Sequence, residues 1–170
     1  MREFLVQVDD PRSADVRDLL AAHLSFARRH SPPEDVHALD VLELLGDSVS
    51  FFSIREGGEL IAVGALKQLD GFHAELKSMH TAGAARRRGA GRAMLDHLVG
   101  VARARGCRRV SLETGSMAAF APARALYASA GFENCEPFGD YRPSPYSAWM
   151  TLALDDGHRS ESGSTEIASS

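Results

Sequence analysis

The sequence predicts an α/β (α+β) fold built on a mixed β-sheet, and two patterns carry that prediction. Residues 49–55, 60–69 and 73–81 read as strands joined by Gly-Gly and Asp-Gly turns, which predicts an antiparallel meander. A helical stretch at 92–105 then separates the third of these strands from another at 110–114. Since strands joined through a helix are usually parallel neighbours, the sheet is expected to contain both strand directions.

The chain before the meander predicts one strand and two helices. Residues 3–8 alternate like a strand, and apolar residues recur at helical spacing in 13–30 and again in 34–45. The length of 170 residues suits one domain, which we expect to span residues 1–154. The polar, Ser/Gly-rich segment 155–170 is expected to be a disordered tail.

The chain after residue 114 predicts one more helix and two strands. Pro122 suits the first turn of an amphipathic helix, and Gly131 suits the position just after its end. Strands are expected at 132–135 and 147–154. The whole order is therefore one strand, two helices, three strands, one helix, one strand, one helix and two strands.

Composition excludes several classes of protein. The net charge of −4 argues against a nucleic-acid partner, although a local basic cluster stands at 86–88. Cys107 and Cys135 cannot form a disulfide framework, and the histidines show no metal-ligand spacing, so no metal is expected. No apolar run reaches the length of a membrane span and no signal-peptide pattern opens the chain, so we expect a cytoplasmic protein with no membrane partner.

The turn before the helix at 92–105 has the chemistry of an anion site. Backbone N–H groups at a helix start are unpaired, and the positive end of the helix dipole points the same way. Gly89 and Gly91 let an anion approach the backbone closely, and Arg86, Arg87 and Arg88 add positive charge. A phosphate or pyrophosphate is the expected ligand.

Two motifs resemble those of the GNAT superfamily of N-acetyltransferases. The pattern Arg86-x-x-Gly89-x-Gly91, after a strand and before a helix, resembles the acyl-CoA-binding motif of that family. The segment 123–132, Ala-x-x-Leu-Tyr-x-x-x-Gly-Phe, resembles its second motif. The resemblance implies the GNAT fold, with parallel strands 4 and 5 splayed apart to admit the pantetheine arm, and acetyl-CoA as the cofactor.

The resemblance also implies a set of cofactor-binding residues on the third meander strand, the glycine turn and the second motif. They are Met79, His80, Thr81, Arg86, Arg87, Arg88, Gly89, Ala90, Gly91, Arg92, Thr114, Phe120, Ala123 and Tyr127. The chain departs from the family at Phe120, where many members carry an asparagine that contacts the pantetheine. Thr114 or Ser116 is the expected replacement for that contact.

Two catalytic residues follow from the resemblance and from the chemistry of acetyl transfer. Tyr127 lies where the family carries a general acid for the departing thiolate. An alkyl amine is protonated at neutral pH, so a base is useful, and Glu75 is the candidate. Glu75 has an equally weighted alternative, which is an ion pair with Lys77 or Arg109.

Other residues are weaker candidates. Glu113 is the alternative base, and His80 could also act as a base, although a lone histidine on a strand is more often structural. The acceptor pocket is expected to be built by the first two helices and the loop 138–146, with Glu113 of the strand at 110–114 as a further candidate. These substrate-binding candidates are His37, Glu34, Glu113 and Tyr141.

The sequence therefore predicts an acetyl-CoA-dependent N-acetyltransferase acting on the primary amine of a small molecule. Two alternatives stay open at this point. One is a protein or peptide N-acetyltransferase, which should need a longer and more open groove. The other is a non-catalytic acyl-CoA-binding sensor. A homodimer is equally open, since no pattern in the chain fixes the oligomeric state.

Overall fold

The computed structural model describes residues 3–31, 41–83 and 89–154, and the strands of these residues form one mixed sheet. Its order is β1-β2-β3-β4-β5-β7-β6, and β4 and β5 are parallel neighbours whereas the other pairs are antiparallel. The strand bounds are β1 Val6–Val8, β2 Val49–Glu56, β3 Glu59–Gln68, β4 His73–Thr81, β5 Arg109–Gly115, β6 Glu133–Cys135 and β7 Ser147–Ala153. The predicted mixed sheet is confirmed.

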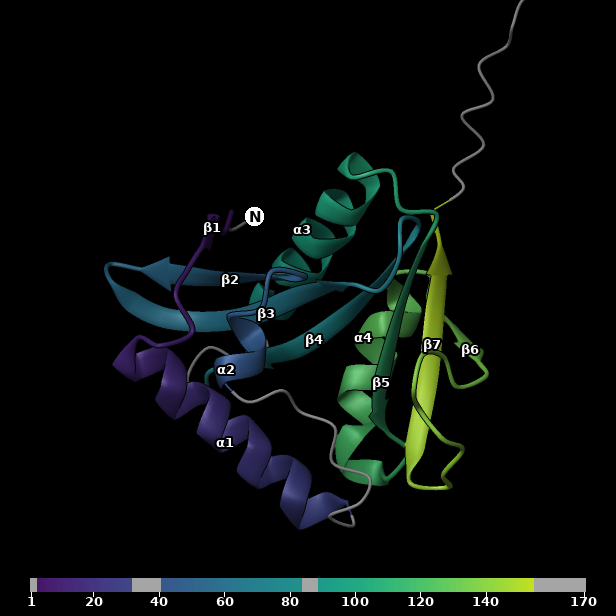
Figure 1. Cartoon of the computed structure of the whole chain (residues 1–170). Helices are drawn as coiled ribbons and strands as arrows, with labels where there is room; N and C mark the ends of the chain where they lie inside the picture. Colours follow the sequence, from purple (N-terminus) through teal and green to yellow (C-terminus); the bar gives the residue numbers. More distant parts are fainter. Residues whose placement is uncertain (1–2, 32–40, 84–88, 155–170) are drawn as a thin grey trace, which may run out of the picture.

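Helices cover both faces of this sheet (Figure 1). Their bounds are α1 Ala14–His30, α2 Val41–Leu44, α3 Ala90–Ala104 and α4 Ala121–Ser129, with the short 3-10 helix η3 Ala118–Phe120 before α4. None of the helices in the described ranges combines the length and the apolar character needed to cross a membrane.

Several local predictions are confirmed at the level of the backbone. Gly57 and Gly58 have φ of 57° and 83°, the paired positive values of the hairpin turn that joins β2 to β3. Gly131 has φ of 96° just after α4, as expected of a residue that ends a helix. The element order agrees with the predicted one.

Two boundaries differ from the prediction by two residues or more. Residues 3–5 are not strand, because β1 pairs with β2 only from Val6 onward. The helix α3 begins at Ala90, two residues before the predicted start, so Gly91 lies inside its first turn. Residues 34–40 of the predicted second helix and the predicted tail at 155–170 lie outside the described residues.

The two faces of the sheet bury different clusters. Ala62 and Leu66 of β3 belong to the larger core, which contains the apolar face of α3, whereas Val63 and Ala65 pack with residues of α1. This alternation follows from the two-residue repeat of a strand. Gly64 faces α3, where a Cβ would lie 2.8 Å from Cγ of Met94, so the absence of a side chain allows α3 to approach the sheet.

The parallel strands β4 and β5 separate along their length. Within the described residues their pairing runs from His73 with Arg109 to Glu75 with Ser111 and ends there. Figure 1 shows the two strands together at one end and apart at the other. The predicted splay of strands 4 and 5 is therefore confirmed, and it leaves an unpaired edge on β4 facing β5.

Candidate active site

A cavity of about 660 Å³ lies where β4 and β5 part. Its walls come from α1, from β3 and β4, from the first turn of α3, and from the segment that runs from β5 through η3 into α4. Tyr141, from the loop before β7, closes one side. The cavity therefore extends from the glycine turn to the face of the sheet that α1 covers.

The N-terminus of α3 forms one end of the cavity. Gly89 has φ of 89°, a conformation that suits glycine, and it lines the cavity together with Gly91 and Arg92. The first N–H groups of a helix have no partner within the helix, so they can bind a phosphate here. Arg86, Arg87 and Arg88 lie outside the described residues.

The unpaired edge of β4 forms the floor. Met79, His80 and Thr81 line the cavity and lie beyond the last β4–β5 pair of the described residues. An extended amide-containing arm could pair with such an edge as an added strand would. The edge and the helix N-terminus therefore fit the two parts of a CoA molecule, its arm and its pyrophosphate.

Of the remaining residues predicted to bind the cofactor, four line the cavity and one does not. Thr114, Phe120, Ala123 and Tyr127 line the cavity. Ala90 does not line it, because this residue packs into the core with no exposed surface. Its contribution to an anion site would come from the backbone alone.

Phe120 fills the space beside β5. Its ring packs edge-on against Phe26 of α1, with 5.3 Å between centroids, and a Cβ on Gly115 would lie 2.2 Å from its Cδ2. Of the two residues expected to replace the family asparagine, Thr114 lines the cavity. Ser116 instead donates its hydroxyl to the carbonyl of Pro145, at 2.5 Å.

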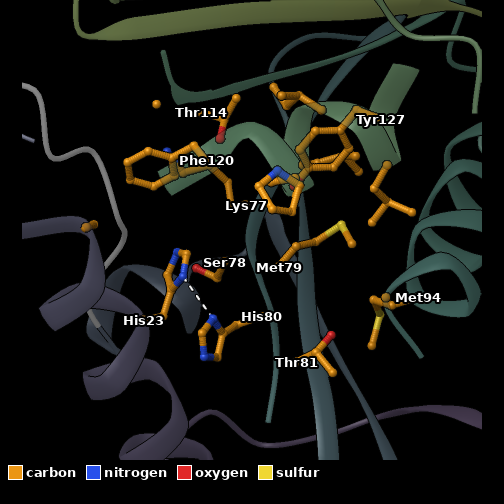
Figure 2. Close-up of a pocket in the computed structure, with 18 of the residues that line it drawn as sticks. His23, Lys77, Ser78, Met79, His80, Thr81, Met94, Thr114, Phe120 and Tyr127 are labelled. Carbon is orange, nitrogen blue, oxygen red and sulfur yellow. Dashed lines mark hydrogen bonds between the residues drawn. The ribbon is translucent and has the colours of Figure 1, made fainter. Parts of the chain in front are cut away.

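Tyr127 is buried at the cavity wall, with 9% of its surface exposed. Burial, and then the nearby Glu113 carboxylate, raises the pKa of Tyr127 to about 12. Its hydroxyl therefore keeps its proton at neutral pH and can donate a hydrogen bond or a proton. Figure 2 shows Tyr127 and Met79 among the residues that line the cavity.

Glu75 is buried behind two residues that line the cavity. Tyr141 donates its hydroxyl to Oε2 of Glu75 at 2.6 Å, and Nζ of Lys77 donates to the Tyr141 hydroxyl at 2.9 Å. The Lys77 ammonium also lies 3.5 Å from Oε2 of Glu75, so the ion pair with Lys77 is formed. Arg109, the other partner considered, instead hydrogen-bonds Thr151.

Glu113 and Tyr141, two residues predicted to bind the acceptor, line the cavity together with Lys77. Burial, and then the carboxylates of Glu75 and Glu113, raises the pKa of Tyr141 well above its usual range. This tyrosine is therefore a neutral bridge between the cavity and the buried Glu75. His37 and Glu34, the other predicted acceptor residues, lie outside the described residues.

A pair of histidines was not predicted as a unit. His23 of α1 and His80 of β4 both line the cavity, and their Nδ1 atoms lie 3.2 Å apart (Figure 2). Burial lowers the pKa of His23, which favours its neutral form. The signal in the sequence is a histidine between Leu20 and Leu24, within the apolar stripe of a predicted helix.

Comparison with known proteins identifies the family of this chain. The family model for the Acetyltransferase (GNAT) family matches residues 14–132, more than half of the chain. The uncharacterized N-acetyltransferase YsnE of Bacillus subtilis (strain 168) is 46% identical over 149 residues, which cover 88% of this chain and 99% of that protein.

Two solved structures extend the comparison. A crystal structure from Klebsiella pneumoniae, of a protein assigned as an acyl-CoA N-acyltransferase, is 27% identical with a TM-score of 0.76 and covers 89% of this chain and 97% of that one. A Bacillus subtilis acetyltransferase in complex with CoA shares the fold, with 16% identity, a TM-score of 0.67, and coverage of 89% of this chain and 99% of that one.

The fold is that of the acyl-CoA-dependent acyltransferases. More specifically, the chain belongs to the GNAT family of acetyltransferases. It is an N-acetyltransferase, and acetyl-CoA is its donor.

Proposed function

We propose that this enzyme transfers the acetyl group of acetyl-CoA to the primary amine of a small molecule. The observation that carries the proposal is the charge at the acceptor side of the cavity. Among the described residues, β4 and β5 bring the carboxylates of Glu75 and Glu113 together with one ammonium, that of Lys77. The excess of negative charge in this cluster favours a cationic amine over a neutral or anionic acceptor.

The boundaries of the cavity support a small acceptor. His23 and Phe26 of α1 wall the cavity on one side, and Tyr141 from the loop before β7 walls it on another. A protein substrate would need a longer and more open groove to hold the main chain that adjoins the reacting amine. The test must therefore distinguish a small-molecule acetyltransferase from a protein or peptide acetyltransferase.

In the proposed mechanism two tyrosines each take part in one proton transfer. Bound acetyl-CoA supplies the acetyl group as a thioester. On the acceptor side, the Tyr141 hydroxyl accepts a proton from the ammonium as it passes its own proton to Oε2 of Glu75, which leaves the amine with a free electron pair. Tyr127 holds a proton on its hydroxyl for the departing sulfur, and Glu113 orients the amine.

This division keeps Glu75 as the proposed base and explains why it can act from behind the cavity wall. The hydrogen bond from Tyr141 to Glu75 is already in place at 2.6 Å. Glu113 is the alternative base, since it lines the cavity directly. Contacts of His37 and Glu34 with the acceptor stay predictions.

The proposal is tested with a panel of amines in an assay for free thiol released from acetyl-CoA. The panel contains spermidine, tyramine, glucosamine and L-lysine, together with peptides that offer either a free N-terminus or an internal lysine. We expect thiol release above the amine-free background with at least one small amine and none with the peptides. Thiol release with the peptides alone would contradict the small-molecule assignment. So would a panel in which no amine gives release above the background.

A further inference from the structure

The strand β4 contains a bulge inside the cavity. β3 and β4 pair through Val63 with His80 and through Ala65 with Lys77, so that Gly64 faces two residues of β4. One of the two is Ser78, whose φ is 55°. It is the only residue other than glycine with positive φ in the described part of the chain. Bulges of this kind redirect a side chain and often stand beside active sites.

The Ser78 hydroxyl is buried without a partner. Ser78 is 9% exposed and lines the cavity, and its Oγ has no hydrogen-bond partner among the described residues. Leaving a buried hydroxyl without a hydrogen bond destabilises the folded state. The left-handed backbone is a further destabilising feature for a residue with a Cβ. Glycine would avoid both costs, so the serine indicates a use for the hydroxyl.

The surroundings of Ser78 show from which side a ligand meets it. On the face toward α3, β4 is covered by the apolar core, which includes Leu76 and packs against Met79. On the opposite face His80 contacts His23 of α1. Figure 2 shows the Ser78 hydroxyl turned to the side where His23 lies. An acceptor that enters between α1 and the sheet therefore meets this hydroxyl.

We propose that Ser78 is a specificity-determining residue whose Oγ accepts a hydrogen bond from an N–H group of the acceptor amine. The inference rests on the proposed function, because it requires an amine as acceptor. An ammonium has three N–H groups to satisfy, and a hydroxyl oxygen has two lone pairs available. Glu113 and the Tyr141 hydroxyl supply further acceptors in the same cavity. Binding of the amine thus satisfies the orphaned hydroxyl.

The test compares Ser78→Ala and Ser78→Gly with wild type, using the amine of the panel that wild type acetylates fastest. Loss of one such hydrogen bond is expected to raise KM for the amine about tenfold, with KM for acetyl-CoA within about twofold of wild type. Glycine also relieves the left-handed strain, so Ser78→Gly should keep or raise the melting temperature while it loses affinity for the amine. That combination cannot result from a damaged fold.

The matched control is Ser147→Ala. Ser147 also has a buried Oγ with no partner among the described residues, but it does not line the cavity. Its KM for the amine should not change. An unchanged KM for the amine in both Ser78 variants would overturn the inference, as would an equal rise in KM for acetyl-CoA. If wild type acetylates no amine of the panel, the proposed function fails first, and the inference fails with it.

Discussion

At the scale of single residues, burial decides what the two cavity tyrosines can do. Tyr127 and Tyr141 both have a raised pKa, with burial as the largest cause and nearby carboxylates adding to it. Both therefore remain protonated at neutral pH. They differ in their partners, because Tyr141 is fixed by Lys77 and Glu75, whereas Tyr127 packs near Phe132, with ring centroids 6.0 Å apart.

Removal of either hydroxyl tests the proposed division of roles. Tyr127→Phe and Tyr141→Phe should each lower kcat by about 100-fold or more, the usual scale for loss of a general acid or base. KM for acetyl-CoA should change little in both. Because the pKa of Tyr127 is about 12, the ratio of wild-type to Tyr127→Phe activity should also stay flat from about pH 7 to about pH 9. Steady-state kinetics over this range is the measurement.

Tyr146→Phe is the control for these variants. Tyr146 is 45% exposed and does not line the cavity, so its activity should match wild type. If Tyr127→Phe keeps full kcat, the acid role is wrong. If Tyr141→Phe keeps full kcat, Glu75 does not act through Tyr141.

At the scale of elements, the end of β5 and the 3-10 helix η3 depend on each other. Gly115 ends β5, and the ring of Phe120 at the end of η3 occupies the position that a side chain on Gly115 would need. Arg124 of α4 donates to the carbonyls of Gly115 and Met117, at 2.6 and 3.0 Å. The observed position of the Phe120 ring therefore requires glycine at position 115.

Gly115→Ala tests this dependence. The added Cβ would lie 2.2 Å from Cδ2 of Phe120, so the ring must move away from its contact with Phe26. Overpacking of this kind costs about 1–3 kcal/mol of unfolding free energy. Chemical denaturation should show the loss, and a cycle with Phe120→Ala should show non-additive effects for the two residues.

Gly100→Ala is the control substitution for Gly115→Ala. Gly100 lies within α3, and a Cβ there would meet no atom within 4 Å, so alanine should raise the unfolding free energy by roughly 0.5–1 kcal/mol. Equal stability of Gly115→Ala and wild type would show that Phe120 moves without cost.

At the scale of the whole molecule, the cavity joins elements that are distant in the chain. Cofactor binding should therefore stabilise α1, the sheet, α3 and α4 together. A ligand present at about 100 times its Kd contributes about 2.7 kcal/mol to stability. For a domain of this size, each kcal/mol shifts the melting temperature by about 2–4 °C. We expect acetyl-CoA to raise the melting temperature by roughly 5–10 °C.

Gly89→Glu should abolish that shift. Its side chain would impose strain at φ of 89° and place a carboxylate at the α3 N-terminus, where the cofactor phosphates are expected. Gly57→Glu controls for strain, since Gly57 also has positive φ, of 57°, but lies in the hairpin turn away from the cavity. That variant should melt lower without cofactor and still show the full shift. An undiminished shift in Gly89→Glu would contradict the predicted cradle.

Much of the fold was predictable because local rules decide it. The Gly57-Gly58 turn, the proline at the start of α4 and the glycine after its end each set the backbone over a few residues. The helix between β4 and β5 predicted their parallel pairing. The bounds of β1 were less predictable, because pairing with β2 determines where that strand begins.

The candidate site, like the fold, was predictable from the sequence only in part. The sequence by itself determined the family, the glycine turn and the strand that carries Glu75, since these depend on motifs of contiguous residues. Only the tertiary structure decided that Tyr141 hydrogen-bonds Glu75, 66 residues away, and that His23 contacts His80, 57 residues away. It also decided that the Ser78 hydroxyl, at the bulge, has no hydrogen-bond partner among the described residues. Such contacts depend on how α1 and the loop before β7 pack on the sheet, and burial in that packing sets the charge state of the side chains.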